Sequence, residues 1–453
     1  MNKRYSMIFT IVAVAAISAT LFGSTYTQTQ VTGTKLDTSK MNVDVLQQIR
    51  DMGGLELSMP QAFAAVDCAN IESGRNVVEF NVSGESHDLP IMGGGTYKAM
   101  TFSGQVPGPT LRVTQGDVVK MTLSVATDEP TPHGNDMHAS QISAVPTFGA
   151  VMPGTSKTYC YVAQVSGVFK YHCSGVNVAA MDQHVLSGMY GIAIVDPIDG
   201  YKKLMVEKTK VEGDKVVGDR QFYSPDALEF TLQYNQLYLT ADGSYDMSAM
   251  MQHHQTQTVV NGMAFGYVPN EGINELITGS KDKNIFVAQP WNSPDLKQYQ
   301  SQLLFVETGK HVRFFVENQG NEPVFWHIVG EIIDRVTQGN RVQAQGTETW
   351  LLGGSQNMIA DVVFDEPGVY VVVNHDYAAI FSGAATVIVA GDPFGLNEKL
   401  KVDPPVASYA YLLGNPSDAV PPMGMNSIAH PKVNLHGLYS DARADEIKAQ
   451  LGI

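Results

Sequence analysis

The chain is short of cysteine and of basic residues, and each shortage excludes a class of protein. Three cysteines in 453 residues are too few for a Cys₄ zinc site or a dense disulfide scaffold. Lysine and arginine number 29 against 45 aspartates and glutamates, so the formal net charge is −16 at pH 7. Because phosphate binding needs clustered Lys and Arg, the composition argues against nucleic acid as a partner.

Long apolar runs are also scarce, and the one substantial run is at the N-terminus. Residues 7–22 are mostly apolar and follow the basic pair Lys3 and Arg4. A basic segment before a short apolar run is typical of a secretory signal. We expect residues 1–28 to be a cleaved signal peptide or, as the alternative, a retained anchor. The protein is therefore expected to be exported, periplasmic or extracytoplasmic, and membrane-anchored if the segment is retained.

Short β-strands make up most of the remaining chain. Residues 76–82, 118–125 and 311–316 alternate or run apolar and β-branched, and turn-rich stretches such as 104–109 lie between such segments. Strands of this length and density, separated by turn residues, are typical of β-sandwiches rather than βαβ units. The sequence therefore predicts an all-β fold of two tandem Greek-key β-sandwiches with N- and C-terminal extensions.

A sequence pattern that occurs in both halves of the chain supports this duplication. Residues 166–172 and 367–375 each contain Gly-Val, then a strand with an aromatic residue, then a histidine, and these histidines are 375 − 172 = 203 positions apart. The predicted organisation, in chain order, is signal or anchor 1–28, N-terminal extension 29–73, first sandwich 74–198, second sandwich 199–391 and C-terminal arm 392–453.

Twelve histidines are the feature most suggestive of chemistry. His133 and His138 are five residues apart, so in an extended segment they point to opposite faces of a sheet. His172 and Cys173 are adjacent and also point opposite ways. This parity predicts two separate sites, one on each face.

One of the two sites has the ligand types of a blue-copper centre. Two imidazoles, one thiolate and one thioether suit such a site, and the chain supplies them in order as His133, Cys173, His184 and Met189. His138 and His172 are left for a second metal on the other face. Six further histidines lack partner spacing and are read as surface or structural: His87, His253, His254, His311, His430 and His436.

These residues, together with the segments 104–117, 259–262 and 366–370, resemble copper-containing nitrite reductases over roughly residues 74–391. That family is a two-cupredoxin-domain relative of the multicopper oxidases, so the resemblance implies cupredoxin-like sandwiches. The acidic, long-armed chain is similar in particular to the enzymes of ammonia-oxidising microbes, especially archaea. It departs from well-known members in a longer loop from Cys173 to His184 and in Gln183, where they often have Trp.

The resemblance implies a role for each candidate site residue. The type-1 copper ligands would be His133, Cys173, His184 and Met189. The type-2 copper ligands would be His138, His172 and His375. The catalytic residues would be Asp136 and His327, with Val329 as the aliphatic residue of the substrate pocket.

The implied activity is the one-electron reduction of nitrite to nitric oxide and water, with two coppers per chain. The implied partners are a small electron-donor protein, either a cupredoxin or a cytochrome, and two further copies of the chain. Because His375 belongs to the second sandwich, the resemblance implies a homotrimer with type-2 sites at the subunit interfaces.

Two alternatives remain at this point. A laccase-like multicopper oxidase needs His-X-His pairs, and the chain has none. A cupredoxin electron-transfer protein would leave Asp136, His138, His327 and His375 without a role. The sequence also leaves open whether Cys68 and Cys160 form a disulfide or are free buried thiols.

Overall fold

The computed structural model describes residues 68, 74–91, 95–142, 147–175, 180–266 and 304–391. The predicted signal or anchor, the C-terminal arm and all of the N-terminal extension except Cys68 lie outside these residues. Within the described ranges, no helix has the length and hydrophobicity needed to cross a lipid bilayer.

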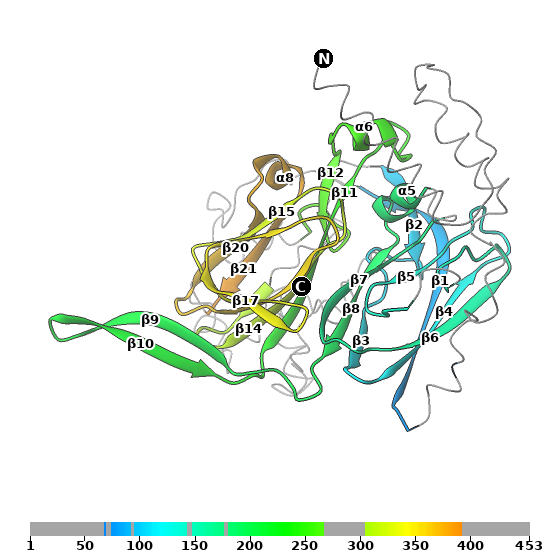
Figure 1. The fold of residues 1–453 in the computed structure, drawn as a ribbon. Coiled ribbons are helices and arrows are strands. Elements are labelled where there is room, and N and C mark those ends of the chain that lie inside the picture. The colour runs from blue at the N-terminus through cyan, green and yellow to red at the C-terminus, as the bar shows by residue number, and fades with distance from the viewer. Residues whose placement is uncertain are drawn as a thin grey trace, which may run out of the picture. The chain divides into compact units, whose positions relative to one another are not determined.

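The first half of the described chain forms two four-stranded sheets (Figure 1). The first has the order β2-β1-β4-β6, with β1 Val77–Pro90, β2 Thr96–Phe102, β4 Val118–Val125 and β6 Ser156–Val162. The second has the order β3-β8-β7-β5, with β3 Leu111–Thr114, β5 Asp136–Met137, β7 Gly167–His172 and β8 Tyr190–Asp196. The short helix α5, Met181–Leu186, lies between β7 and β8 in the chain.

Alternating side chains explain why these segments are strands. In β4, Val119, Met121 and Leu123 are buried, while the residues between them are more exposed. Successive residues of a strand point to opposite faces, so this pattern turns one face toward the core between the sheets. The expectation of strands near 76–82, 118–125 and 311–316 is confirmed by β1, β4 and β14.

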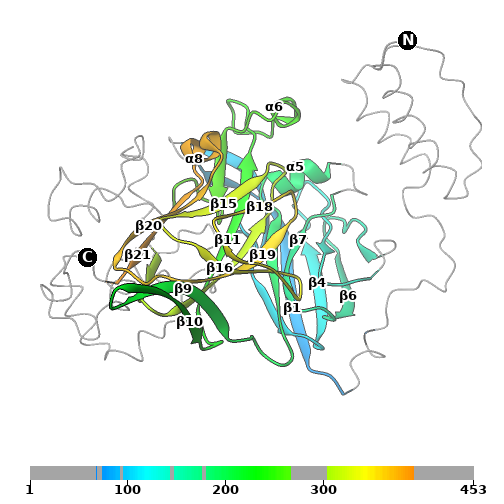
Figure 2. The same ribbon diagram turned by 60° about the vertical axis from the view of Figure 1, so that its left-hand side comes forward.

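The second half of the chain forms two larger sheets (Figure 2). One has the order β12-β11-β14-β19-β16-β17, with β11 Leu228–Leu237, β12 Gln257–Val260, β14 His311–Asn318, β16 Ile333–Gln338, β17 Arg341–Thr347 and β19 Asn357–Val363. The other has the order β13-β21-β20-β15-β18, with β13 Leu304–Val306, β15 Val324–Val329, β18 Thr349–Leu352, β20 Gly368–Asn374 and β21 Ala385–Ala390. The remaining elements are the hairpin β9 Leu204–Glu212 and β10 Lys215–Tyr223 and the helices α6 Met247–Met251 and α8 Tyr377–Ser382.

The two halves repeat one strand arrangement. In the first, β1 and β4 run parallel, as do β3 and β8; in the second, β11 and β14 run parallel, as do β13 and β21. This repeat agrees with the all-β duplication expected from the sequence. The two echoed histidines are not equivalent, however: His172 ends β7 opposite Tyr190, whereas His375 lies one residue beyond β20.

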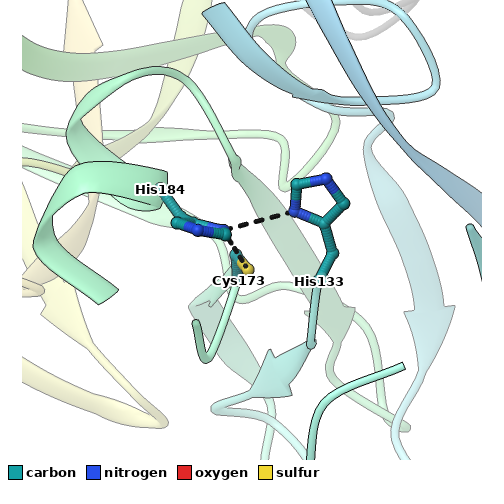
Figure 3. Close-up of side chains that lie close together, drawn as sticks. All are labelled: His133, Cys173 and His184. Atoms are coloured by element: carbon teal, nitrogen blue, oxygen red, sulfur yellow. Dashed lines mark hydrogen bonds between the residues drawn. The ribbon is translucent and has the colours of Figure 1, made fainter. Parts of the chain in front are cut away.

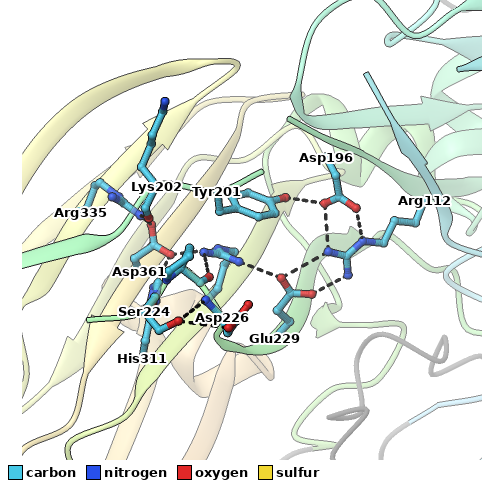
Figure 4. Close-up of polar contacts among 12 residues, drawn as sticks. Arg112, Asp196, Tyr201, Lys202, Ser224, Asp226, Glu229, His311, Arg335 and Asp361 are labelled. Atoms are coloured by element: carbon cyan, nitrogen blue, oxygen red, sulfur yellow. Dashed lines mark hydrogen bonds and ion pairs between the residues drawn. The ribbon is translucent and has the colours of Figure 1, made fainter. Parts of the chain in front are cut away.

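A network of ion pairs joins the two sandwiches. Arg112 of β3 contacts Asp196 at the end of β8 and Glu229 of β11 (Figure 4). Arg313 of β14 continues the network from Glu229, at 2.9 Å, to Asp361, at 3.0 Å. The Nε2–H of His311 donates to the same Asp361 carboxylate at 2.7 Å, and His311 is buried, so a structural role for this histidine agrees with the expectation.

Candidate metal centres

Strands β5 and β7 place several polar side chains on one face. Asp136 pairs directly with His172 across the two strands. The N–H of His138 donates to the carbonyl of Lys170 at 3.1 Å, so these two residues are also opposite each other. Because residues two apart in a strand share a face, Asp136, His138, Lys170 and His172 all lie on the same side.

Cys173 follows His172 and belongs to a different group of side chains. Its Sγ lies 3.3 Å from Nδ1 of His184, and that nitrogen lies 3.2 Å from Nδ1 of His133 (Figure 3). All three residues are buried. We call His133, Cys173 and His184 the Cys173 group. Met189, the fourth ligand predicted there, is also buried, and its carbonyl accepts the Cys173 N–H at 3.0 Å.

The protonation of the Cys173 group suits a soft cation. Burial lowers the pKa of His133, and it lowers the pKa of His184 to about 4. Burial raises the pKa of the Cys173 thiol to about 11, although N–H groups of Gly134 and Gly175 point at the sulfur from 3.3 Å. The neutral imidazoles of His133 and His184, with their Nδ1 atoms 3.2 Å apart, can both donate a lone pair to a metal ion bound between them. A metal ion bound there would also deprotonate the thiol of Cys173. The residues therefore fit copper.

The second group has the complementary set of nitrogen ligands. Nε2 of His138 lies 3.0 Å from Nε2 of His172. Nδ1 of His172 bonds to the carbonyl of Cys173 at 2.9 Å, which leaves Nε2 free to bind a metal. Oδ2 of Asp136 lies 3.8 Å from that Nε2. We call Asp136, His138 and His172 the His172 group.

Burial also controls protonation in the His172 group. It lowers the pKa of His138 to about 4 and that of His172 to about 3, and the positive charge of Lys170 acts in the same direction. Burial raises the pKa of Asp136, with Lys170 opposing it. The imidazoles are thus ready to bind a cation at neutral pH, while the carboxyl group holds its proton more firmly than an exposed aspartate.

The remaining predicted residues lie on β15 and just beyond β20. The rings of His327 and His375 are 5.2 Å apart between centroids. Among the described residues, ligand atoms that gather within 4.8 Å of one another form only the Cys173 and His172 groups, so His375 joins neither within one chain. The structure therefore brings six of the predicted residues into two groups and leaves the His327–His375 pair apart.

The sheet face that carries this pair is exposed and apolar. Along β15, Val324, Trp326 and Ile328 are buried, while the residues between them point outward. Val329 is 49% exposed, and Leu351 of the neighbouring strand is 52% exposed. Apolar side chains are therefore exposed beside His327 on this face.

Two charged residues near these groups were missed by the sequence reasoning. Glu129 contacts His133, and Lys170 lies on the face of the His172 group. A lysine inside the otherwise apolar segment 167–171 was a usable signal, because an unpaired lysine is rarely buried. Glu129 carried no such signal, since it lies among polar turn residues.

Two groups of candidate metal ligands that meet at the consecutive residues His172 and Cys173, in the first of two tandem β-sandwiches, are the arrangement expected of multicopper oxidases and their relatives. Residues 85–199 match the family model of a multicopper oxidase domain. The copper nitrite reductase of Nitrosomonas europaea is 30% identical, with a TM-score of 0.55, and the match covers 70% of this chain and 95% of that one.

Two further relatives of known function are also copper-containing nitrite reductases. The copper-containing nitrite reductase of Rhizobium sullae is 29% identical over 354 residues, covering 75% of this chain and 82% of that protein. That of Neisseria meningitidis serogroup A is 26% identical over 299 residues, covering 64% of each. The chain belongs to the copper-containing nitrite reductases, and it is an oxidoreductase that uses copper.

Proposed function

We propose that the chain reduces nitrite to nitric oxide and water by joining a type-1 copper site in the Cys173 group to a type-2 copper site in the His172 group. One observation carries the proposal: His172 and Cys173 are consecutive in the chain, yet each belongs to a different ligand group. A covalent path of one peptide unit therefore connects the two sites.

The proposed ligands follow from the geometry above. Type-1 copper would be held by His133, Cys173, His184 and Met189. Type-2 copper would be held by His138, His172 and, from a neighbouring subunit, His375. Copper supplies one-electron chemistry at the first site and polarises a bound anion at the second.

Asp136 is placed to deliver a proton. The overall reaction, NO₂⁻ + e⁻ + 2H⁺ → NO + H₂O, consumes two protons. Asp136 is half-buried beside His172, and burial raises its pKa, so its Oδ2 can carry a proton to an oxygen of nitrite.

His327 is the candidate for the second proton. Its Nδ1 bonds to the carbonyl of Glu348 at 2.9 Å, which fixes the ring and leaves Nε2 available. Val329 lies two residues further along the same face of β15 and would line the nitrite pocket.

A homotrimer would complete the type-2 site. The exposed face around His327, Val329 and His375 would pack against the His172 group of a neighbouring copy, so that each of three interfaces holds one site. Three apolar side chains on or beside this face are exposed in the single chain, and this supports the contact: Phe325, Leu351 and Tyr377.

The proposal also covers the domain boundaries, the export of the enzyme and its electron donor. The first cupredoxin domain would span 74–198 and the second 199–391, between an N-terminal signal or anchor with its extension and the arm 392–453. The enzyme would be exported, and a small cupredoxin or cytochrome would supply the electron.

Anaerobic nitrite turnover tests the function. Purified enzyme with a one-electron donor should release nitric oxide stoichiometrically with nitrite consumed, with two coppers bound per chain. One copper and no turnover would instead indicate an electron carrier. Four coppers with oxygen consumption would indicate a laccase-like oxidase.

A further inference from the structure

A buried carboxylate lies against the proposed type-1 ligands. Oε1 of Glu129 is 3.2 Å from Nε2 of His133, the ring nitrogen that faces away from His184. Ser86 holds the carboxylate in place through its N–H at 2.8 Å and its hydroxyl at 2.7 Å. Glu129 is only 8% exposed, so little water screens its charge.

The surroundings of Glu129 suit a carboxylate anion, because its oxygens accept bonds from the N–H and the hydroxyl of Ser86 and lie against the ring of His133. Burial alone would raise the pKa of Glu129, but the bonds from Ser86 and His133 outweigh it and the pKa is lowered. A carboxylate that accepts the other N–H of a metal-binding imidazole fixes the ring and adds electron density to it.

A buried ammonium lies on the face of the proposed type-2 ligands. Lys170 is 4% exposed and stands two residues before His172 on β7. Its Nζ donates to the carbonyl of Gln319 at 2.6 Å and contacts the hydroxyl of Ser355 at 3.3 Å. Both partners belong to the second sandwich, so the cation is clamped between the two sandwiches.

Two acids act on that ammonium through their charges, Glu317 and Asp136. Burial raises the pKa of Glu317 well above its ordinary value and also raises that of Asp136, which favours the neutral form of both. Burial lowers the pKa of Lys170 to about 8, whereas the carbonyl of Gln319 and the hydroxyl of Ser355 beside its Nζ are suitable partners for an ammonium group. Its charge reaches Asp136, His138 and His172, because it shifts the protonation of all three.

We propose that Glu129 and Lys170 are positioning residues of opposite charge that set the direction of electron flow between the two copper sites. The proposal rests on the assignment of the Cys173 and His172 groups to type-1 and type-2 copper.

The direction follows from electrostatics. A negative charge beside a metal stabilises its more positive, oxidised form and lowers its reduction potential, whereas a positive charge stabilises the reduced form and raises it. Glu129 therefore lowers the potential at the Cys173 group and Lys170 raises the potential at the His172 group. One electron moves from the first site to the second with no bond made or broken, and both charges favour that transfer.

Two variants test the proposal, with ascorbate or dithionite as reductant. In Glu129→Gln, potentiometric titration of the visible band should show the type-1 equilibrium shifted about tenfold toward the reduced form, which is about 59 mV for one electron. In Lys170→Met, titration followed by the type-2 electron paramagnetic resonance signal should shift about tenfold toward the oxidised form.

Matched controls separate these effects from a general loss of charge. Asp128→Asn and Lys203→Met remove the same charges at exposed positions and should shift either equilibrium less than twofold. Lys170→Arg should keep the type-2 potential. If Lys170→Met folds poorly, the double variant Lys170→Met/Glu317→Gln removes the buried acid as well and should show the same shift.

Several results would overturn the proposal. These are an unchanged type-1 equilibrium in Glu129→Gln, an unchanged type-2 equilibrium in both Lys170→Met backgrounds, or a shift as large in the surface controls. Loss of type-2 copper from folded Lys170→Met would also overturn it, since removing a cation should not weaken copper binding. A wild-type protein that lacks either copper signal would instead refute the proposed function, and this is measured first.

Discussion

Asp136 and His172 lie directly opposite each other on β5 and β7, and the residue after His172, Cys173, faces the other ligand group. The proposed proton donor and the proposed electron path thus meet at His172. His172 contacts the carboxyl group through one ring nitrogen and the Cys173 carbonyl through the other. The predictions below separate these two connections.

Cys173→Ser should abolish the visible absorption of the protein and remove one copper per chain. The colour of a blue-copper site comes from its thiolate, and a hydroxyl is a poor substitute for that soft ligand. Absorption spectra and copper analysis provide the measurement. Cys68→Ser is the matched control and should keep the colour; a coloured Cys173→Ser protein would rule out this ligand.

His375→Ala should empty the type-2 site while the visible band stays unchanged, because His375 lies apart from the Cys173 group. Copper per chain should fall from two to one, with loss of the type-2 electron paramagnetic resonance signal. His253→Ala, at an exposed histidine that contacts Glu322, should change neither.

The same residue tests the subunit arrangement. His375→Ala and His138→Ala chains should each be inactive alone, yet co-expressed chains should regain part of the activity. In mixed trimers, some interfaces combine His138 from one chain with His375 from the other. Absence of any recovery in verified mixed trimers would contradict a site shared between subunits.

Asp136→Asn should keep both coppers but lose about 100-fold or more of nitrite turnover, the usual contribution of a general acid. Since burial raises the pKa of Asp136 and the group must be protonated to donate, wild-type turnover should fall as pH rises through that raised pKa. The variant should lack this limb of the pH profile. Asp199→Asn, at an exposed position, serves as the control, and full activity of Asp136→Asn would remove it from the proton path.

The disulfide between Cys68 and Cys160 should stabilise the first sandwich. It closes a loop with a sequence separation of 92 and ties the chain before β1 to the buried face of β6. Cys68→Ala should lower the free energy of unfolding by about 2–5 kcal/mol. Urea unfolding with and without dithiothreitol checks this: the reductant should destabilise the wild type and leave the variant unchanged. Equal stability of both proteins would show that the bond contributes nothing.

Arg313→Met should destabilise the chain by about 3–5 kcal/mol, because it leaves Asp361 buried with fewer partners. Burial acts to raise the pKa of Asp361, but the bond from His311 and the charges of Arg313 and Arg335 outweigh it, so the net shift is downward. A carboxyl with a lowered pKa contributes stability above its unfolded pKa and loses it as pH falls through its folded pKa.

Acid unfolding of Arg313→Met should therefore begin at a higher pH than that of the wild type. Circular dichroism during urea and acid titrations measures both effects. Arg220→Met, which breaks an exposed ion pair with Glu207, should cost no more than about 1 kcal/mol. A similar cost for the two variants would show that the buried network is not stabilising.

The sequence by itself determined the strands, and it supplied the residue types that gather in both groups. Strand parity is a local property: it places adjacent His172 and Cys173 on opposite faces whatever the rest of the chain does. His133 and His138 also belong to separate groups, but only residues 136–137 between them form a strand, so their spacing alone did not establish the separation.

Only the tertiary structure decided which distant residues meet. The bond between Cys68 and Cys160 and the contacts of Ser86 with Glu129 depend on how loops return to the sheets, which spacing does not encode. The hydrogen bond from Lys170 to Gln319 depends on contact with the second sandwich. That contact holds the charge of Lys170 in the interior, where it lowers the pKa of His172. Burial sets the pKa of Asp136 for the same reason, since desolvation arises from the whole fold and not from neighbours in the chain.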